Sequence, residues 1–143
     1  MAEKFELASQ AWFDEVFRLF AKVAGENPDL SFSVCEVFTK VPSRLGPDGD
    51  GRKAWHAFIR DGRSEAAMGE VAGSKVDVKT IAEWEAVLPA ARARIDLTPE
   101  GLARYQQLSA QAVADGRIQR SGDTTKAPPA LVAVHNALAD LTL

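Results

Sequence analysis

The chain has 143 residues, the length of about one domain, and its 46% hydrophobic and 26% charged residues are typical of a globular protein. Its net charge is −3, and its 17 basic residues are scattered among 20 acidic ones, so we expect no nucleic-acid partner. One cysteine, Cys35, and two histidines are too few for an internal disulfide or a structural zinc site. Without a phosphate-binding loop or a metal-spaced cluster, we expect no metal and no cofactor.

Hydrophobic runs in the chain are all shorter than the roughly 20 residues that span a bilayer. Residues 1–7 also lack the basic-then-apolar pattern of a signal peptide. We therefore expect a cytoplasmic protein that makes at most transient contact with a membrane.

The first predicted helix follows Ser9, a suitable N-cap, and ends near Gly25 and Asn27-Pro28. Its apolar residues recur every three or four positions and form a wide stripe: Trp12, Phe13, Val16, Phe17, Phe20 and Val23. Residues 30–38 alternate in polarity, which predicts a strand, although Glu36 interrupts its apolar side. The proline- and glycine-rich residues 41–51 predict an exposed loop.

Residues 54–69 are predicted to form a hairpin around an Asp61-Gly62 turn. A two-residue turn sets one register, with Trp55 opposite Met68, Ala57 opposite Ala66 and Ile59 opposite Ser64. These residues share one face, which is apolar but carries only small side chains where the two alanines meet. The other face carries His56, Phe58, Arg60, Glu65 and Ala67.

A fourth strand is predicted at residues 74–79, followed by a helix that starts with a Thr80–Glu83 capping box and is kinked or ended by Pro89. That helix presents Ile81, Trp84, Val87 and Leu88. Thr98-Pro99-Glu100 predicts a further helix, which ends at Asp115-Gly116 and presents Leu102, Tyr105, Leu108, Ala112 and Val113.

A last short strand is predicted at residues 117–121, before a helix that opens at Pro128-Pro129. This helix carries Leu131, Val134, His135, Leu138 and Leu141 on one stripe. The order of elements predicts a single α+β domain over residues 1–143. It consists of a five-stranded, mixed but mainly antiparallel sheet covered on one face by helices, with the first three strands forming an antiparallel meander.

Three local patterns, in this order, resemble the sterol carrier protein type 2 family. The first is the hairpin from Ala54-Trp55 through Asp61-Gly62 to Gly69, and the second is Val76-Asp77-Val78 followed by an amphipathic helix. The third runs from Asp115-Gly116-Arg117-Ile118 to Ser121-Gly122-Asp123. The chain departs from the family pattern in a longer helical segment at residues 89–115 and in the inserted residues 124–129, both near the expected mouth of the family's ligand tunnel.

The resemblance implies a cavity between sheet and helices that holds a sterol, a fatty acid or an acyl thioester such as an acyl-CoA, for carriage or presentation. Its floor would consist of Trp55, Ile59 and Met68, continued by Phe32 and Val34, with Ala57 and Ala66 leaving room above. The roof or wall would be Trp84, Leu88, Tyr105, Leu131, His135 and Leu138. The alternative is that a helix packs closely over the alanines and leaves no void.

Two other classes of function fit the sequence. A small enzyme could act on a steroid or acyl-CoA substrate with Glu36 or His135 as acid or base and Tyr105 as an oxyanion donor. Each of these side chains also has a simpler interpretation. Glu36 would lie at the sheet edge or face solvent, and His135 would be a core or rim histidine whose hydrogen bonds are satisfied within the protein. Tyr105 would lie at the boundary between core and solvent. His56 is expected at the surface and Cys35 in the core. In an interaction module, the aromatic stripe of the first helix or the last helix would bind a partner or a second copy as a homodimer.

Overall fold

The computed structural model describes residues 3–143, within which five strands form one sheet. The strand order is β3-β2-β1-β4-β5, so the first strand lies at the centre. The β1–β4 pair is parallel and the other pairs are antiparallel, which confirms the predicted mixed sheet and the β1–β2–β3 meander. The strands are β1 (Phe32–Thr39), β2 (Lys53–Arg60), β3 (Arg63–Met68), β4 (Val78–Glu83) and β5 (Ile118–Gly122).

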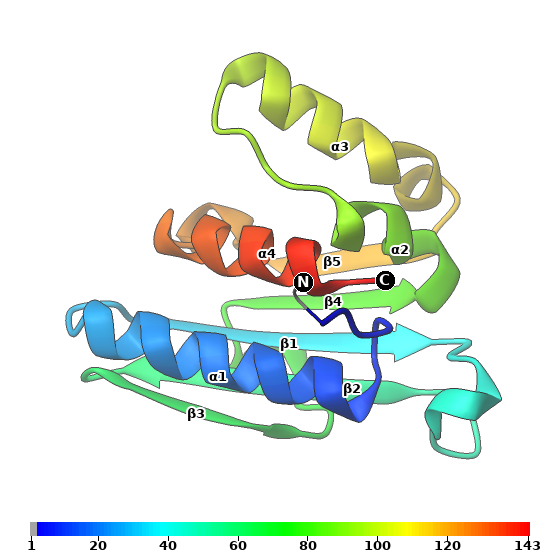
Figure 1. Ribbon diagram of the computed structural model, residues 1–143, viewed down its shortest axis with the longest axis horizontal. Helices are drawn as coiled ribbons and strands as arrows, with labels where there is room; N and C mark the ends of the chain where they lie inside the picture. Colours follow the sequence, from blue (N-terminus) through cyan, green and yellow to red (C-terminus); the bar gives the residue numbers. More distant parts are fainter. Residues whose placement is uncertain (1–2) are drawn as a thin grey trace.

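Four α-helices of residues 3–143 cover one face of this sheet (Figure 1). Helix α1 packs on β2 and β3, α2 on β4, and α3 on β5, whereas α4 packs against α1 and α2. The helices therefore contact the strands toward both edges of this one face, while α4 packs mainly on α1 and α2. The helices are α1 (Gln10–Glu26), α2 (Trp84–Arg92), α3 (Pro99–Ala114) and α4 (Ala130–Leu141).

Helix α1 forms where it was predicted, and its aromatic stripe is part of the core of this chain. The Ser9 hydroxyl accepts a hydrogen bond from the Trp12 amide at 3.2 Å, which satisfies one of the free N–H groups of the first turn. The stripe is buried except for Phe17, which is half-buried. Because the stripe packs on the sheet and on α4, it is not available as a surface for a partner.

The hairpin has the predicted register, with Trp55 opposite Met68 and Ala57 opposite Ala66. Asp61 and Gly62 both have positive φ angles, +54° and +74°, as a tight two-residue turn requires. The turn therefore decides which side chains of β2 and β3 face the helices.

The prediction for the segment between the hairpin and α2 was wrong. β4 extends over Val78–Glu83, so Thr80 and Ile81 are strand residues, and α2 begins at Trp84 without a side-chain cap. The parallel pairing with β1 draws this segment into the sheet, and the alternate burial of Val78, Thr80 and Ala82 favours a strand over a helical turn.

Helix α2 runs past Pro89 to Arg92, so of the two expected effects of the proline, a kink or an end, it does not end the helix. The packing of Ala86 and Ala90, both buried, holds the turns around the proline in place.

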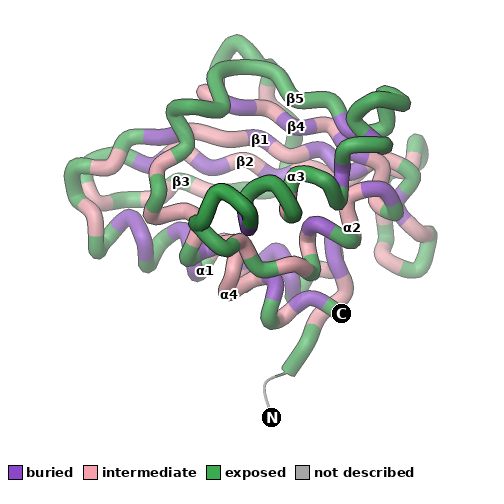
Figure 2. The backbone as a smooth tube through the Cα atoms, turned by 90° about the horizontal axis from the view of Figure 1, so that it is seen from above, coloured by how far each residue is buried: buried purple, intermediate pink, exposed green. Residues whose placement is uncertain are grey.

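Helix α3 starts and ends as predicted, with the Thr98 hydroxyl accepting a bond from the Gly101 amide at 3.0 Å and Gly116 in a left-handed conformation. Its predicted apolar face, however, is largely open. Only Gly101, Ser109 and Ala112 are buried. Because small residues make the contact, α3 covers little of the sheet and most of its backbone is exposed (Figure 2). The exposed apolar side chains are Leu102 at 38%, Leu108 at 43% and Val113 at 47%.

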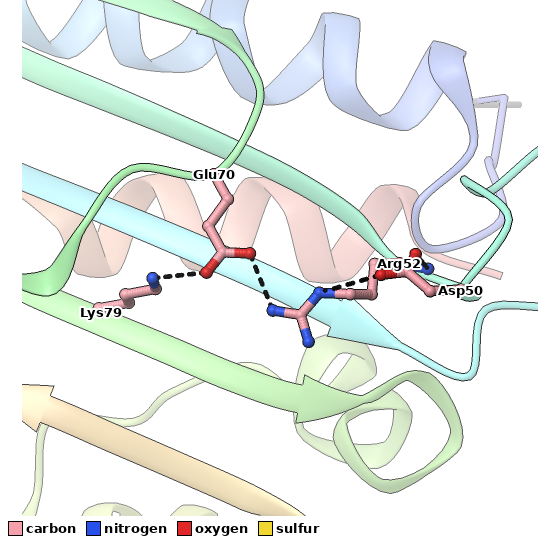
Figure 3. A network of polar contacts seen from close by, with 4 residues as sticks. All are labelled: Asp50, Arg52, Glu70 and Lys79. Atoms are coloured by element: carbon pink, nitrogen blue, oxygen red, sulfur yellow. Dashed lines mark hydrogen bonds and ion pairs between the residues drawn. The ribbon is translucent and has the colours of Figure 1, made fainter.

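The opposite face of the sheet carries a polar network rather than helices (Figure 3). Glu70 accepts hydrogen bonds from Arg52 at 2.8 Å and from Lys79 at 2.7 Å, and Arg52 also pairs with Asp50 at 3.8 Å. These bonds hold the connection after β3 across the face of the sheet that is opposite the helices. Cys35 lies on this face and is fully buried, as predicted. Burial raises the pKa of the Cys35 thiol.

Candidate functional site

One row of paired residues crosses the helix-covered face of the sheet. Glu36 of the central strand lies opposite Trp55 of β2 and beside Thr80 of β4, which in turn pairs with Arg120 of β5. Since paired residues point to the same face, this row places Glu36 in the middle of the sheet, under the helices. The simpler expectation of an edge or solvent-facing Glu36 was wrong.

The orientation of the Glu36 carboxyl group is set by Trp55. The indole Nε1 of Trp55 donates a hydrogen bond to Oε1 of Glu36 at 3.0 Å. The indole ring is itself held by two aromatic rings of α1, with centroids at 6.3 Å for Phe17 and 5.2 Å for Phe20. The second carboxyl oxygen, Oε2, has no hydrogen-bond partner within residues 3–143 and is not sealed from solvent.

Burial raises the pKa of Glu36, and the Trp55 hydrogen bond and the positive charge of Arg120 only partly oppose that effect. The same residue is nevertheless only half-buried by surface area, as is Val34 two positions earlier on the same face. Their strand neighbours are closed, with Ala57 at 0% and Trp55 at 3% exposure. Glu36 therefore lies deep in the protein, yet part of its surface and of that of Val34 stays in contact with solvent. The helices do not seal the central strand at these two residues.

Tyr105 of α3 completes the polar surroundings of Glu36. Burial raises the pKa of Tyr105, the negative charge of Glu36 raises it further, and Arg120 lowers it. The three side chains from β1, β5 and α3 are therefore close enough to act on one another electrostatically. The ring of Tyr105 meets His135 edge-on, with the centroids 5.2 Å apart.

His135 serves mainly to tie α4 to the connection between α2 and α3. Its Nε2 lies 2.7 Å from the carbonyl oxygen of Ala93, which accepts the bond and so places the ring proton on Nε2. Burial lowers the pKa of His135. Its neighbour Asn136 makes two hydrogen bonds to the backbone of Ile95, at 2.6 and 3.1 Å. His135 is thus a satisfied histidine, in agreement with the simpler interpretation.

The other predicted site residues are not all on the closed part of the covered face. Phe32, Trp55, Ala57 and Ile59 are buried on the sheet, and Val34, Leu88, Leu131 and Leu138 are half-buried and pack against the main core. Trp84 is half-buried against the main core, where its indole donates a hydrogen bond to the carbonyl of Leu7 at 2.7 Å and its ring lies under the guanidinium of Arg44. Met68 is 38% exposed at the sheet edge.

Thr80 and Arg120 were not predicted as site residues. Each lies on a short strand, and only the pairing of β4 with β1 and of β5 with β4 brings them into the row of Glu36. No local sequence signal marks that row, because it depends on strand register.

Two hollows of the surface lie outside this site. One of about 850 Å³, at the ends of β1 and β2, shares Phe32 and Ile59 with the predicted set but is also lined by charged residues such as Arg60, Arg63 and Asp77. The other, of about 380 Å³, lies beside Met68 and Glu70. Over residues 3–143, no group of three or more His, Cys, Asp or Glu side chains could hold a metal ion. No helix described here is long and apolar enough to cross a membrane.

The fold and the half-open covered face define a small α+β protein with an interior surface between sheet and helices. No protein-family model and no curated protein matches the chain. Solved structures do match it. The solution structure of a conserved hypothetical protein from Thermus thermophilus, named as a candidate sterol carrier protein, has a TM-score of 0.53 and 14% identity over 99% of this chain and 93% of that one.

The crystal structure of sterol carrier protein 2 has a TM-score of 0.55 and 13% identity, and the match covers 96% of this chain and all of that chain. The chain therefore has the sterol carrier protein 2 fold, as the sequence patterns indicated.

Proposed function

We propose that the protein binds an apolar ligand over the central strand, between the sheet and the helices, and carries or presents it. The ligand classes are a sterol, a fatty acid or an acyl thioester. The observation that supports this most directly is the residual exposure of Val34 and Glu36 on the covered face. The likeness to a structure named sterol carrier protein 2 agrees with it.

The energetics of an apolar interior surface also favour a ligand. An empty apolar void costs about 24 cal/mol per Å³, so an unfilled hollow beside Val34 would lower the stability of the fold. A ligand restores the lost van der Waals contacts and removes apolar surface from water. Because α3 makes its contacts through small residues, we expect a ligand to enter beside Tyr105.

The test is to place a large side chain of the protein where the ligand is proposed to lie. We expect Val34→Phe to weaken the binding of the neutral fluorescent probe Nile red at least tenfold, while the melting temperature stays within a few degrees of wild type. The matched control is Ala67→Phe, which adds the same ring to the opposite, exposed face and should leave binding unchanged. Equal binding by Val34→Phe and wild type, or no binding of the probe by wild type, would refute the proposal.

A second experiment identifies the natural ligand. Native mass spectrometry and solvent extraction of freshly purified protein should find an apolar molecule in wild type and much less of it in Val34→Phe. Protein free of lipid in both measurements would count against a carrier.

Glu36 favours one alternative function, an enzyme acting on an apolar steroid or acyl-CoA substrate. A carboxyl group with a raised pKa and one oxygen without a hydrogen-bond partner, near enough to Tyr105 to raise its pKa, is suited to proton transfer. His135 fits this less well, since its Nε2 is engaged by Ala93. Turnover that is lost in Glu36→Gln while Nile red still binds would support the enzyme over the carrier.

A further inference from the structure

We propose that Glu36 selects the head group of the ligand, and that the preferred ligand is a neutral alcohol rather than a fatty-acid anion. This inference rests on the proposed function and adds the ligand class. It follows from the placement of Glu36 on the central strand of the covered face, next to the apolar Val34, and from which of its two carboxyl oxygens has no hydrogen-bond partner.

The geometry leaves one oxygen of the Glu36 carboxyl group for a polar head. Oε1 of Glu36 is occupied by the Trp55 indole, which Phe17 and Phe20 keep in place, so the carboxyl group cannot turn freely. Oε2 has no hydrogen-bond partner within residues 3–143, and the Glu36 residue as a whole is half-buried. A ligand whose apolar part lies along Val34 therefore brings its head to Oε2.

A hydroxyl group suits this oxygen in either protonation state. It can accept a hydrogen bond from the protonated carboxyl group, and it can donate one to the carboxylate. A ligand carboxylate can only accept, so it pairs with Glu36 only while Glu36 is protonated, and it is repelled once Glu36 ionises.

The groups that face Glu36 do not compensate for a second negative charge. β2 contributes the indole of Trp55, β4 the hydroxyl of Thr80, and α1 the two phenylalanines. From α3 comes Tyr105, whose raised pKa keeps it neutral, and beyond it lies His135 of α4, whose lowered pKa keeps it neutral near pH 7. Among residues 3–143, Arg120 of β5 is the one cation whose charge lowers the pKa of Glu36, and it lies exposed at the sheet edge.

The experiment compares 1-dodecanol with dodecanoate, which share one chain length, as competitors of bound Nile red. In wild type at pH 8 we expect dodecanol to bind at least tenfold more tightly than dodecanoate. The ratio of the dodecanol affinity to the dodecanoate affinity should fall toward pH 5, where the carboxyl groups of Glu36 and of dodecanoate take up protons. In Glu36→Gln the pH 8 ratio should drop at least threefold, because the amide carries no charge and still offers both a donor and an acceptor.

Glu65→Gln is the matched control, since Glu65 lies exposed on the opposite face and its change should leave the ratio at the wild-type value. Equal binding of the two ligands by wild type, or an unchanged ratio in Glu36→Gln, would overturn the inference while the proposed function stands. If Nile red itself fails to bind, the proposed function fails instead. Tighter binding of dodecanoate that disappears in Arg120→Ala would assign head-group selection to Arg120 and overturn the role of Glu36. Should Glu36→Gln not fold, the wild-type pH profile still decides, because a ratio at or below one at pH 8 refutes the inference.

Discussion

Replacing Thr142 by valine should measure how strongly the C-terminal end of the chain is tied to α1. The Thr142 hydroxyl accepts a hydrogen bond from the Trp12 indole Nε1 at 3.1 Å and donates one to the carbonyl of Leu138 at 2.6 Å. Both side chains are buried, at 4% exposure for Thr142 and 5% for Trp12. Valine keeps the shape but leaves the indole N–H unpaired, which costs about 1–3 kcal/mol.

For a chain of this length, about 1 kcal/mol corresponds to about 3 °C in melting temperature, so Thr142→Val should lower it by about 3–9 °C. Thr142→Ser is the control, because it keeps the hydroxyl and loses one methyl group, worth about 0.8 kcal/mol. Thermal and urea unfolding of both variants, of Trp12→Phe and of the Trp12→Phe/Thr142→Val double variant should give a coupling energy of about 1 kcal/mol. A Thr142→Val protein as stable as Thr142→Ser would refute the hydrogen bond as the source of the coupling.

Two further stability predictions follow from Glu36 and Gly122. The raised pKa of Glu36 means that the folded state holds this proton more tightly than the unfolded state, so above the ordinary glutamate pKa of about 4.3 wild type should lose stability relative to Glu36→Gln. This loss of stability should be absent at pH 3.5 and reach its full size once Glu36 ionises in the folded protein. Urea unfolding of both proteins from pH 3.5 to 8.5 measures it. The prediction would be contradicted if the free energies of unfolding of wild type and Glu36→Gln changed with pH in the same way. At Gly122, with φ +91°, an added Cβ would lie 2.0 Å from the carbonyl oxygen of Asp77, so Gly122→Ala should cost on the order of 2–4 kcal/mol, whereas Gly25→Ala, with nothing within 4 Å, should be neutral or stabilising. Equal melting temperatures for the two alanine variants would show that the strained contact is absent.

Much of the fold could be predicted because local signals agree with the tertiary structure. The stripe of α1, its Ser9 cap and the Asp61-Gly62 turn each act within a few residues, and the turn by itself sets the register of β2 against β3. The same holds for the start of α3 at Thr98, where cap and proline coincide. Gly122 belongs to a predicted pattern as well, and the close approach of Asp77 supplies its physical reason.

The site was less predictable because it depends on contacts between distant segments. Thr80 and Glu83 look like a capping box in isolation, yet pairing with β1 makes them strand residues. The same pairing puts Thr80 beside Glu36 and, through β5, brings Arg120 into the row. Leu102 and Leu108 form part of an apolar face by spacing, but α3 stands too far out to bury them.

From its amino-acid order alone, this protein could be assigned its elements, their sequence along the chain, the hairpin register and the sterol carrier protein 2 fold. The elements and the hairpin register depend on periodicity, capping and turn geometry, which short segments carry by themselves, whereas the sterol carrier protein 2 fold was implied by the resemblance of three local patterns to that family. Only the tertiary structure decided that Glu36 lies on the central strand beneath the helices, with one oxygen held by Trp55 and the other free. Strand order and the distance between α4 and the sheet are properties of the whole assembly, and no local pattern encodes them.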